Sequence, residues 1–246
     1  MVWWHGEQGS VALMRTEPLQ LVAHRGDPVH EIENTLAAVR RARADGAALI
    51  EVDLRRTADG ECVLLHDPTS LRLWGVDRPV REQRTAELAP GIPLLRDALV
   101  EAAPSALLLD LPDDGPDPLL AHAVVDTVRA VRAADPSVPA PSYCGGLTAM
   151  RAVRASEPSA EIRLTWKVPE PIPDEILVEL RPRSWNPPHE LVDAASIAWA
   201  RAHGLEVTCW TVDDARRAEE LAVLGVDAIT SNRAGALRRE LGIRTR

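Results

Sequence analysis

Short apolar runs alternate with helix-like segments from Leu19 to the end of the 246-residue chain. The first run covers 19–23 and the last covers 226–230. Strands that alternate with helices pair in parallel through right-handed crossovers. About eight such units in a chain of this length predict an α/β fold, a (β/α)8 TIM barrel in a single domain. The competing fold is an open doubly wound sheet, but residues 24–27 lack the Gly-rich turn that it favours.

The domain organisation follows from the absence of a linker or a sequence repeat. We expect an N-terminal extension over 1–18, a barrel domain over 19–246, and a loop excursion at 67–92, where no element pattern is clear. The first twenty residues do not have the pattern of a signal peptide. Because no apolar run approaches the ~18 residues of a membrane span, we expect a cytoplasmic protein without stable membrane insertion.

Charge and cysteine content limit the classes of partner. The net charge of −9 argues against a nucleic-acid-binding protein and against docking on anionic membranes. Cys62, Cys144 and Cys209 lie far apart in apolar runs and lack metal-ligand spacing. They are predicted to be buried, reduced thiols.

Two carboxylates interrupt the apolar run at 47–54. Glu51 and Asp53 are two residues apart, so they share one strand face, and the apolar residues between them share the other. In a barrel the apolar face packs on helices, so the acids point inward. Buried neighbouring carboxylates repel, and a hard divalent cation such as Mg2+ or Ca2+ would remove that conflict. The alternative is a salt bridge to Arg55, which has the same strand parity.

Asp110 is a third candidate metal ligand. It interrupts the apolar run 106–109, where a charge is costly unless it is paired or coordinated. It also lies near the carboxyl end of a strand, where the active sites of barrels lie. The alternative is that Asp110 caps the turn that follows.

His24 and His66 each end an apolar run close to the acid pair. One of them could accept a proton while the other donates one. Arg25 follows His24, and its planar guanidinium suits two phosphate oxygens. The alternative for Arg25 is that it neutralises Glu51 or Asp53.

Aromatic residues mark the ends of several predicted strands. They could form the wall of a pocket for an apolar or polyol group, or pack at the barrel rim. These residues are Tyr143, Trp166, Trp185 and Trp210.

In order and spacing, these motifs resemble the glycerophosphodiester phosphodiesterase family. The matching residues are His24-Arg25-Gly26, Glu33-Asn34-Thr35, Glu51-x-Asp53, Thr57-x-Asp59-Gly60, His66-Asp67 and, more weakly, Ile92-Pro93-x-Leu95, Trp210-Thr211-Val212 and Gly225 to Thr230. The resemblance implies a (β/α)8 barrel that hydrolyses glycerophosphodiesters to glycerol 3-phosphate and an alcohol. It also implies these site residues: His24 and His66 as the acid–base pair, Glu51, Asp53 and Asp110 as ligands of a divalent metal, and Arg25 at the phosphate. From their places at the ends of predicted strands, we add Lys167 and Trp210 as candidates for contact with the substrate.

The sequence departs from the family pattern in three places. The third metal position is usually Glu and here is Asp110. Two residues later the family usually has Lys and here it is Pro112, so we hypothesise that Lys167 supplies the missing positive charge. The segment between His66 and Ile92 is short, which leaves the substrate preference open.

Two other functions remain as alternatives. One is a lysophospholipase D or sphingomyelinase-D-like lipid phosphodiesterase, with Leu71, Leu73 and Trp74 as an apolar lip. The other is a barrel that binds a phosphodiester without hydrolysing it. The head group, the metal and the oligomeric state are not fixed by the sequence.

Overall fold

The computed structural model describes residues 19–112, 117 and 119–243. The expected extension at 1–18 lies outside this part of the chain. Within it, eight parallel strands close into a barrel in the order β1-β11-β10-β9-β8-β7-β6-β2, and β2 pairs with β1. The barrel strands are β1 (Gln20–Ala23), β2 (Leu49–Arg56), β6 (Ala106–Leu111), β7 (Ser142–Gly145), β8 (Glu161–Thr165), β9 (Ser184–Asn186), β10 (Glu206–Cys209) and β11 (Ala228–Ser231). The predicted single-domain TIM barrel is therefore confirmed.

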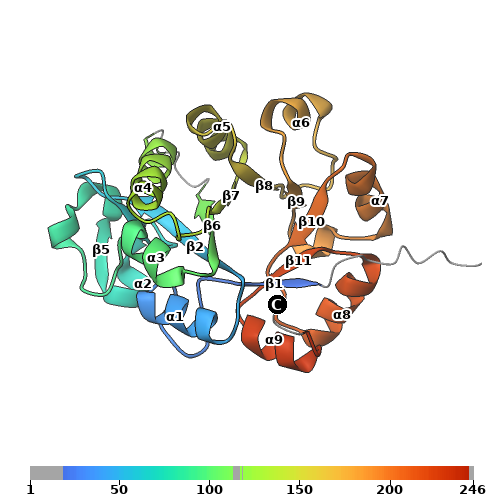
Figure 1. The fold of residues 1–246 in the computed structure, drawn as a ribbon, viewed down its shortest axis with the longest axis horizontal. Coiled ribbons are helices and arrows are strands. Elements are labelled where there is room, and N and C mark those ends of the chain that lie inside the picture. The colour runs from blue at the N-terminus through green and yellow to red at the C-terminus, as the bar shows by residue number, and fades with distance from the viewer. Residues whose placement is uncertain (1–18, 113–116, 118, 244–246) are drawn as a thin grey trace, which may run out of the picture.

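Helices surround the barrel on its outer side (Figure 1). They are α1 (Leu36–Ala44), α3 (Leu95–Ala102), α4 (Leu120–Ala134), α5 (Leu147–Ser156), α6 (Asp174–Leu180), α7 (Ala194–Ala202), α8 (Ala215–Leu224) and α9 (Ala234–Glu240). Several begin where a side chain accepts a hydrogen bond from a helical N–H group, as Thr35 does for α1 and Asp214 for α8. Gly225 ends α8 in the left-handed conformation that glycine adopts readily.

Strand alternation divides the buried residues into two layers. Ile50, Val52 and Leu54 on β2 belong to the main core between the strands and the helices. Leu49 has the opposite parity and packs inside the barrel with Leu108 and other interior residues. Glu51 and Asp53 share the parity of Leu49, so the expected inward direction of the two acids agrees with the packing.

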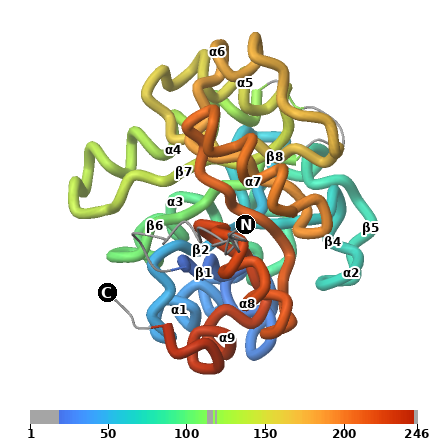
Figure 2. The backbone as a smooth tube through the Cα atoms, turned by 90° about the vertical axis from the view of Figure 1, so that its right-hand side faces the viewer, coloured from blue at the N-terminus to red at the C-terminus, as the bar shows by residue number. Residues whose placement is uncertain are grey.

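The sequence predicts a loop excursion with no clear element at 67–92, and the structure shows several short elements in this segment. It contains β4 (Thr69–Ser70), α2 (Leu71–Trp74), β5 (Val76–Pro79) and the 3-10 helices η1 (Val80–Glu82) and η2 (Thr85–Glu87). Elements of two to four residues are too short to show a hydrophobic period, which explains why no element is clear in the sequence. Figure 2 shows that this segment projects from one side of the barrel.

The residues 189–203 contain two helical elements in place of one continuous helix. They form η3 (His189–Leu191) and α7, because Asp193 and Ser196 form a capping box that starts α7. The strand before His66, β3 (Cys62–Leu64), pairs antiparallel with β2 and lies outside the closed barrel. His66 therefore reaches the site from a hairpin and not from a barrel strand.

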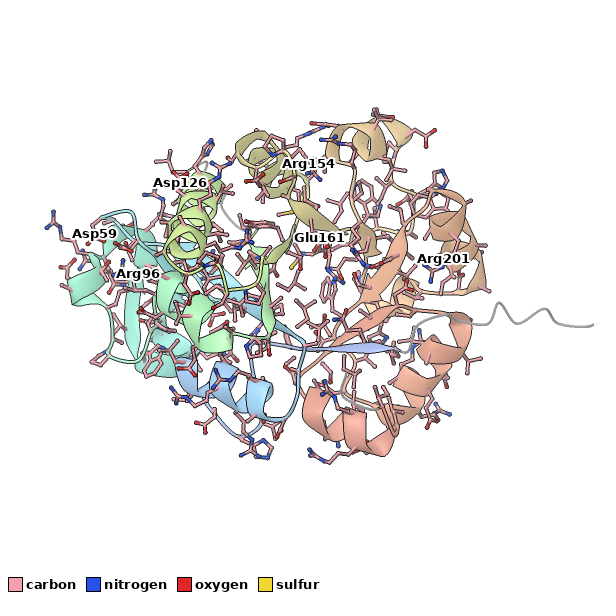
Figure 3. The ribbon with its side chains drawn as sticks, in the orientation of Figure 1. Asp59, Arg96, Asp126, Arg154, Glu161 and Arg201 are labelled. Carbon is pink, nitrogen blue, oxygen red and sulfur yellow. The ribbon has the colours of Figure 1, made fainter. Side chains whose placement is uncertain are left out.

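Charged side chains cover the outer ring of helices (Figure 3). Arg154 on α5 donates to the backbone carbonyl of Leu180 at 2.9 Å. Arg201 on α7 pairs with Asp227 at 2.9 Å. These contacts join neighbouring β/α units, so much of the arginine content supports the barrel wall.

Candidate active site

A cavity of about 430 Å³ opens at the carboxyl ends of the barrel strands. All eight predicted site residues line it, although only three of them lie on barrel strands, β2 and β6, and the others lie in the segments that follow β1, β3, β8 and β10. The eight residues are His24, Arg25, Glu51, Asp53, His66, Asp110, Lys167 and Trp210. The barrel topology thus gathers residues that are up to 186 positions apart, the separation of His24 and Trp210.

The three acids form a cluster at the base of this cavity. Oxygen atoms of Glu51, Asp53 and Asp110 lie within 4.8 Å of one another, and Asp110 stands opposite Asp53 in the β2–β6 register. Burial, with the negative charges of Asp53 and Asp110, raises the pKa of Glu51 well above its usual value. Glu51 Oε1 is buried and has no hydrogen-bond partner among the described residues. Three converging carboxylates with an unsatisfied oxygen fit a hard divalent cation.

Asn34 holds one of the acids in place, a role that sequence reasoning missed. Its Nδ2 donates to Asp53 Oδ2 at 2.7 Å, and its Oδ1 accepts from the backbone N–H of Asp53 at 3.0 Å. Asn34 has a φ of +57°, a left-handed conformation that Asn adopts more readily than most residues. In the sequence Asn34 is marked only as part of the Glu33-Asn34-Thr35 motif, and Thr35, its neighbour, caps α1.

Arg25 lies between the acid cluster and the first loop. Its backbone N–H donates to Glu51 Oε2 at 2.9 Å, and its Nη1 donates to Glu33 at 2.8 Å. Its Nε is 3.1 Å from Asp53 Oδ2 without the alignment of a hydrogen bond, so this contact is a charge interaction. Gly26, at φ +83°, permits the turn because a Cβ atom there would lie 2.6 Å from the carbonyl carbon of Ala38.

His24 is held in one tautomer by an amide. Its Nδ1 lies 2.7 Å from Asn232 Oδ1, and the amide orientation is fixed because Asn232 Nδ2 donates to Asp213 at 2.8 Å. Nδ1 must therefore carry a proton, which leaves Nε2 of the neutral ring as an acceptor 3.8 Å from Glu51. Burial and the charge of Arg25 lower the pKa of His24, which favours the neutral ring. Neither Asn232 nor Asp213 had a sequence pattern that marked it.

His66 is held at the cavity by its neighbour in the sequence. Its Nδ1 lies 2.7 Å from Asp67 Oδ1, and Arg72 donates to the other oxygen of Asp67 at 2.7 Å. Arg55, the alternative partner for the acid pair, donates to the backbone carbonyl of His66 at 3.0 Å. The Asp67 carboxylate accepts a hydrogen bond and so favours the Nδ1–H tautomer of His66.

Lys167 and Trp210 lie on a further part of the rim. The Lys167 ammonium is 5.9 Å from the centroid of the Trp210 ring, and the Trp210 indole N–H donates to the backbone carbonyl of Asn186 at 3.1 Å. Lys167 lines the same cavity as Pro112, the position that lacks the usual family lysine. The lysine thus lines the same cavity as the acids and Arg25.

The other aromatic residues expected at the pocket wall pack elsewhere. Trp185 is buried and makes an edge contact with Trp199, with ring centroids 6.0 Å apart. Tyr143 belongs to the core outside the strands, and burial raises its pKa to about 12. Trp166 donates to the carbonyl of Glu170. Strand ends alone did not determine the direction of these rings, so for these three residues the pocket interpretation was wrong.

All three cysteines are reduced and buried, as expected. Cys144 lines the cavity opposite Asp110 in the β6–β7 register, and burial raises its pKa well above the usual value. A protonated thiol in this position packs as a small apolar group.

Metal binding is expected to stabilise the folded chain, and more strongly at higher pH. The pKa of Glu51 is raised in the folded state, so the protonated form of Glu51 favours folding of the metal-free chain. This contribution to stability is fully present below the usual glutamate pKa of 4.5. It is lost as the pH rises through the pKa of Glu51 in the folded state. A bound cation offsets the repulsion that then develops. At 100 times Kd, Mg2+ or Ca2+ adds about 2.7 kcal/mol, or roughly 5–10 °C in Tm.

Thermal unfolding in EDTA and in excess Mg2+ or Ca2+, at pH 5.5 and pH 8, measures this effect. The difference in Tm between metal and EDTA should be larger at pH 8. Equal Tm values with and without metal at pH 8 would contradict the assignment of the acid cluster.

Across the described ranges, no helix has both the length and the apolar character needed to cross a membrane.

Comparison with known proteins bears on the identity of this barrel. The model of the glycerophosphoryl diester phosphodiesterase family matches residues 24–92 and 119–236. The chain is 56% identical over 48 residues to glycerophosphodiester phosphodiesterase 1 of Bos taurus, a match that covers 20% of this chain and only 14% of that protein. It is 28% identical over 252 residues to "Probable glycerophosphodiester phosphodiesterase 2" of Mycobacterium tuberculosis, with 88% of each covered.

Solved structures show the same fold. An Oleispira antarctica phosphodiesterase, solved in complex with the product sn-glycerol-3-phosphate, aligns with a TM-score of 0.80 at 22% identity and covers 91% of this chain and 96% of its own. The glycerophosphodiester phosphodiesterase of Thermotoga maritima aligns with a TM-score of 0.72 at 18% identity, covering 92% of this chain and all of its own. Because the family model matches most of the sequence, this chain belongs to the glycerophosphoryl diester phosphodiesterase family.

Proposed function

We propose that this protein is a metal-dependent phosphodiesterase that hydrolyses glycerophosphodiesters to glycerol 3-phosphate and an alcohol. The observation that carries the proposal is one cavity that contains a three-carboxylate cluster, an arginine, and two histidines in defined tautomers. Family membership and the product in the name of the Oleispira complex support it.

The acid cluster would hold the metal. Glu51, Asp53 and Asp110 offer oxygen ligands, which suit Mg2+ or Ca2+. A bound cation would supply positive charge to the phosphoryl oxygens. Arg25, oriented by Glu33 and Asp53, would add a second positive group at the phosphate.

The histidines would move protons. Nε2 of neutral His24 accepts the proton of the substrate's own glycerol hydroxyl as that oxygen attacks phosphorus. His66 donates a proton to the oxygen of the leaving alcohol. The product of this step is a cyclic phosphate, which water opens when His66 accepts the water proton and His24 returns its proton to the glycerol oxygen. Each histidine thus ends the cycle in its starting state.

Product analysis tests the proposal and its substrate class. A panel of glycerophosphocholine, glycerophosphoethanolamine, glycerophosphoinositol and lysophosphatidylcholine, with excess Mg2+ or Ca2+, should release glycerol 3-phosphate from at least one of the first three. Exclusive release of lysophosphatidic acid would indicate the lipid enzyme, for which Leu71, 51% exposed in the projecting segment, offers an apolar contact. Release of the phosphorylated head group would show cleavage of the other ester bond and contradict the proposed reaction.

Lys167→Met should raise KM about tenfold and change kcat less. The ammonium is proposed to replace the charge that Pro112 lacks, and one charge-assisted hydrogen bond contributes roughly 1.5–3 kcal/mol. Lys167→Arg keeps the charge and should retain most of the activity. Steady-state kinetics on the preferred substrate measure both variants. An unchanged kcat/KM for Lys167→Met would remove Lys167 from the substrate site.

A further inference from the structure

Arg72, an exposed residue of α2 in the projecting segment, makes contacts that lead into the active site. Its Nε donates to Asp67 Oδ2 at 2.7 Å. Its Nη2 and Nη1 donate to the two oxygens of Glu33 at 2.7 Å and 3.1 Å. One guanidinium therefore joins the loop after β1 to the loop after β3.

Both carboxylates that Arg72 binds hold a group of the proposed machinery on their other side. Asp67 Oδ1 lies 2.7 Å from Nδ1 of His66. Glu33 Oε1 accepts from Nη1 of Arg25 at 2.8 Å. The chain of contacts runs from His66 through Asp67, Arg72 and Glu33 to Arg25. It connects the proposed proton donor to the proposed phosphate ligand through residues outside the cavity lining.

The charge states suit this arrangement. Partial burial would raise the pKa of Glu33 and of Asp67, but the hydrogen bonds from Arg72 and the other positive partners outweigh it, so both pKa values are lowered. Both groups are carboxylates at neutral pH and accept hydrogen bonds only. Three N–H donors of one rigid plane are engaged at once, which a lysine cannot reproduce.

We propose that Arg72 is a positioning residue that fixes the distance and orientation between His66 and Arg25 through Asp67 and Glu33. The inference rests on the proposed function, because it gives those two residues their roles. It also gives a role to α2, which lies in the segment that the sequence predicts as a loop excursion. Residues that orient catalytic groups in this way typically contribute 10- to 100-fold to activity.

Arg151 provides a matched control on the outer surface. It makes a two-pronged ion pair with Glu179 at 2.8 Å, and its side chain is 48% exposed compared with 45% for Arg72. It lies on α5, and neither it nor Glu179 lines the cavity. Arg151→Ala therefore controls for the loss of a half-exposed arginine and its two-pronged ion pair, whereas Arg72→Ala also removes the contact with Asp67.

Steady-state kinetics with the preferred glycerophosphodiester form the first test. Arg72→Ala should lower kcat/KM by about 10- to 100-fold, mainly through kcat, and Arg151→Ala should stay within twofold of wild type. Added guanidinium at a non-denaturing concentration should raise the activity of Arg72→Ala at least threefold. It should not change the activity of Arg151→Ala. Arg72→Lys should remain at least fivefold below wild type. Wild-type kcat in folded Arg72→Ala, or absence of guanidinium rescue, would overturn the proposal.

A crystal structure of Arg72→Ala, or of Arg72→Lys if the alanine variant does not fold, separates this inference from the function itself. We expect His66, Arg25 or both to leave their present contacts with Asp67 and Glu33. Retention of both contacts at their present lengths would overturn the positioning role, whether or not the wild type hydrolyses a glycerophosphodiester. Failure of the wild type to release glycerol 3-phosphate would instead contradict the proposed function.

Discussion

Replacing His24 with alanine is expected to lower kcat about 10²- to 10⁴-fold while KM changes little. The proton acceptor in the proposed first step is Nε2 of His24, and a positioned acid or base typically contributes a factor of this size. The tautomer is fixed by Asn232, and burial with Arg25 favours the neutral ring. Removal of the imidazole leaves the acid cluster and Arg25 to bind substrate. Steady-state kinetics at saturating metal measure the effect.

His30→Ala is the matched control for this variant. His30 pairs with Asp27 at 2.8 Å, its side chain is 50% exposed, and it does not line the cavity. It should retain wild-type kcat. If His24→Ala keeps more than a tenth of wild-type kcat, with the same product, His24 is not the base and the proposed proton pathway is wrong.

Glu51→Gln is expected to lower the activity measured with metal and to raise the stability of the metal-free protein. The glutamine keeps the size of the side chain but removes a negative charge from the metal site. Since a bound cation supplies several kcal/mol of transition-state stabilisation, kcat/KM at fixed metal concentration should fall about 10³-fold. In EDTA the variant should melt at a higher temperature than wild type, because the repulsion with Asp53 and Asp110 is relieved. Each kcal/mol of relieved repulsion raises Tm by about 2–4 °C.

Thermal unfolding and kinetics on the same preparations test both effects. The rise in Tm that Mg2+ or Ca2+ gives to wild type should be small or absent in Glu51→Gln. Glu179→Gln, which removes one exposed partner of an ion pair far from the cavity, should keep wild-type activity and the full response to metal. A Glu51→Gln variant that is less stable than wild type in EDTA, yet still responds to metal, would contradict the assigned role of Glu51.

The sequence predicted the parts of the site that depend on strand geometry. Glu51 and Asp53 could be assigned to the barrel interior because the period of a strand is two and the alternate residues are apolar. Asp110 could be assigned because a charge in an apolar strand needs a partner. The position of both histidines at the ends of apolar runs indicated the carboxyl edge of the sheet, where active sites of such barrels lie.

The supporting contacts could not be predicted because they join distant loops. Asn232 is 208 residues from His24, and Asn34 is 19 residues from Asp53. Their partners are set by backbone turns such as the left-handed Asn34, which no hydrophobic period reports. Arg72 was missed for the same reason, since α2 is only four residues long.

The most direct test of the account is the rate of glycerol 3-phosphate release from the preferred glycerophosphodiester after treatment with EDTA and again after addition of Mg2+ or Ca2+. We predict no measurable release in EDTA, recovery with one of the two ions, and loss of the recovered rate in His24→Ala. Equal release in EDTA and with metal would contradict the metal-dependent mechanism. No release under any condition, with calorimetry still showing binding of the phosphodiester, would indicate a binding barrel in place of an enzyme.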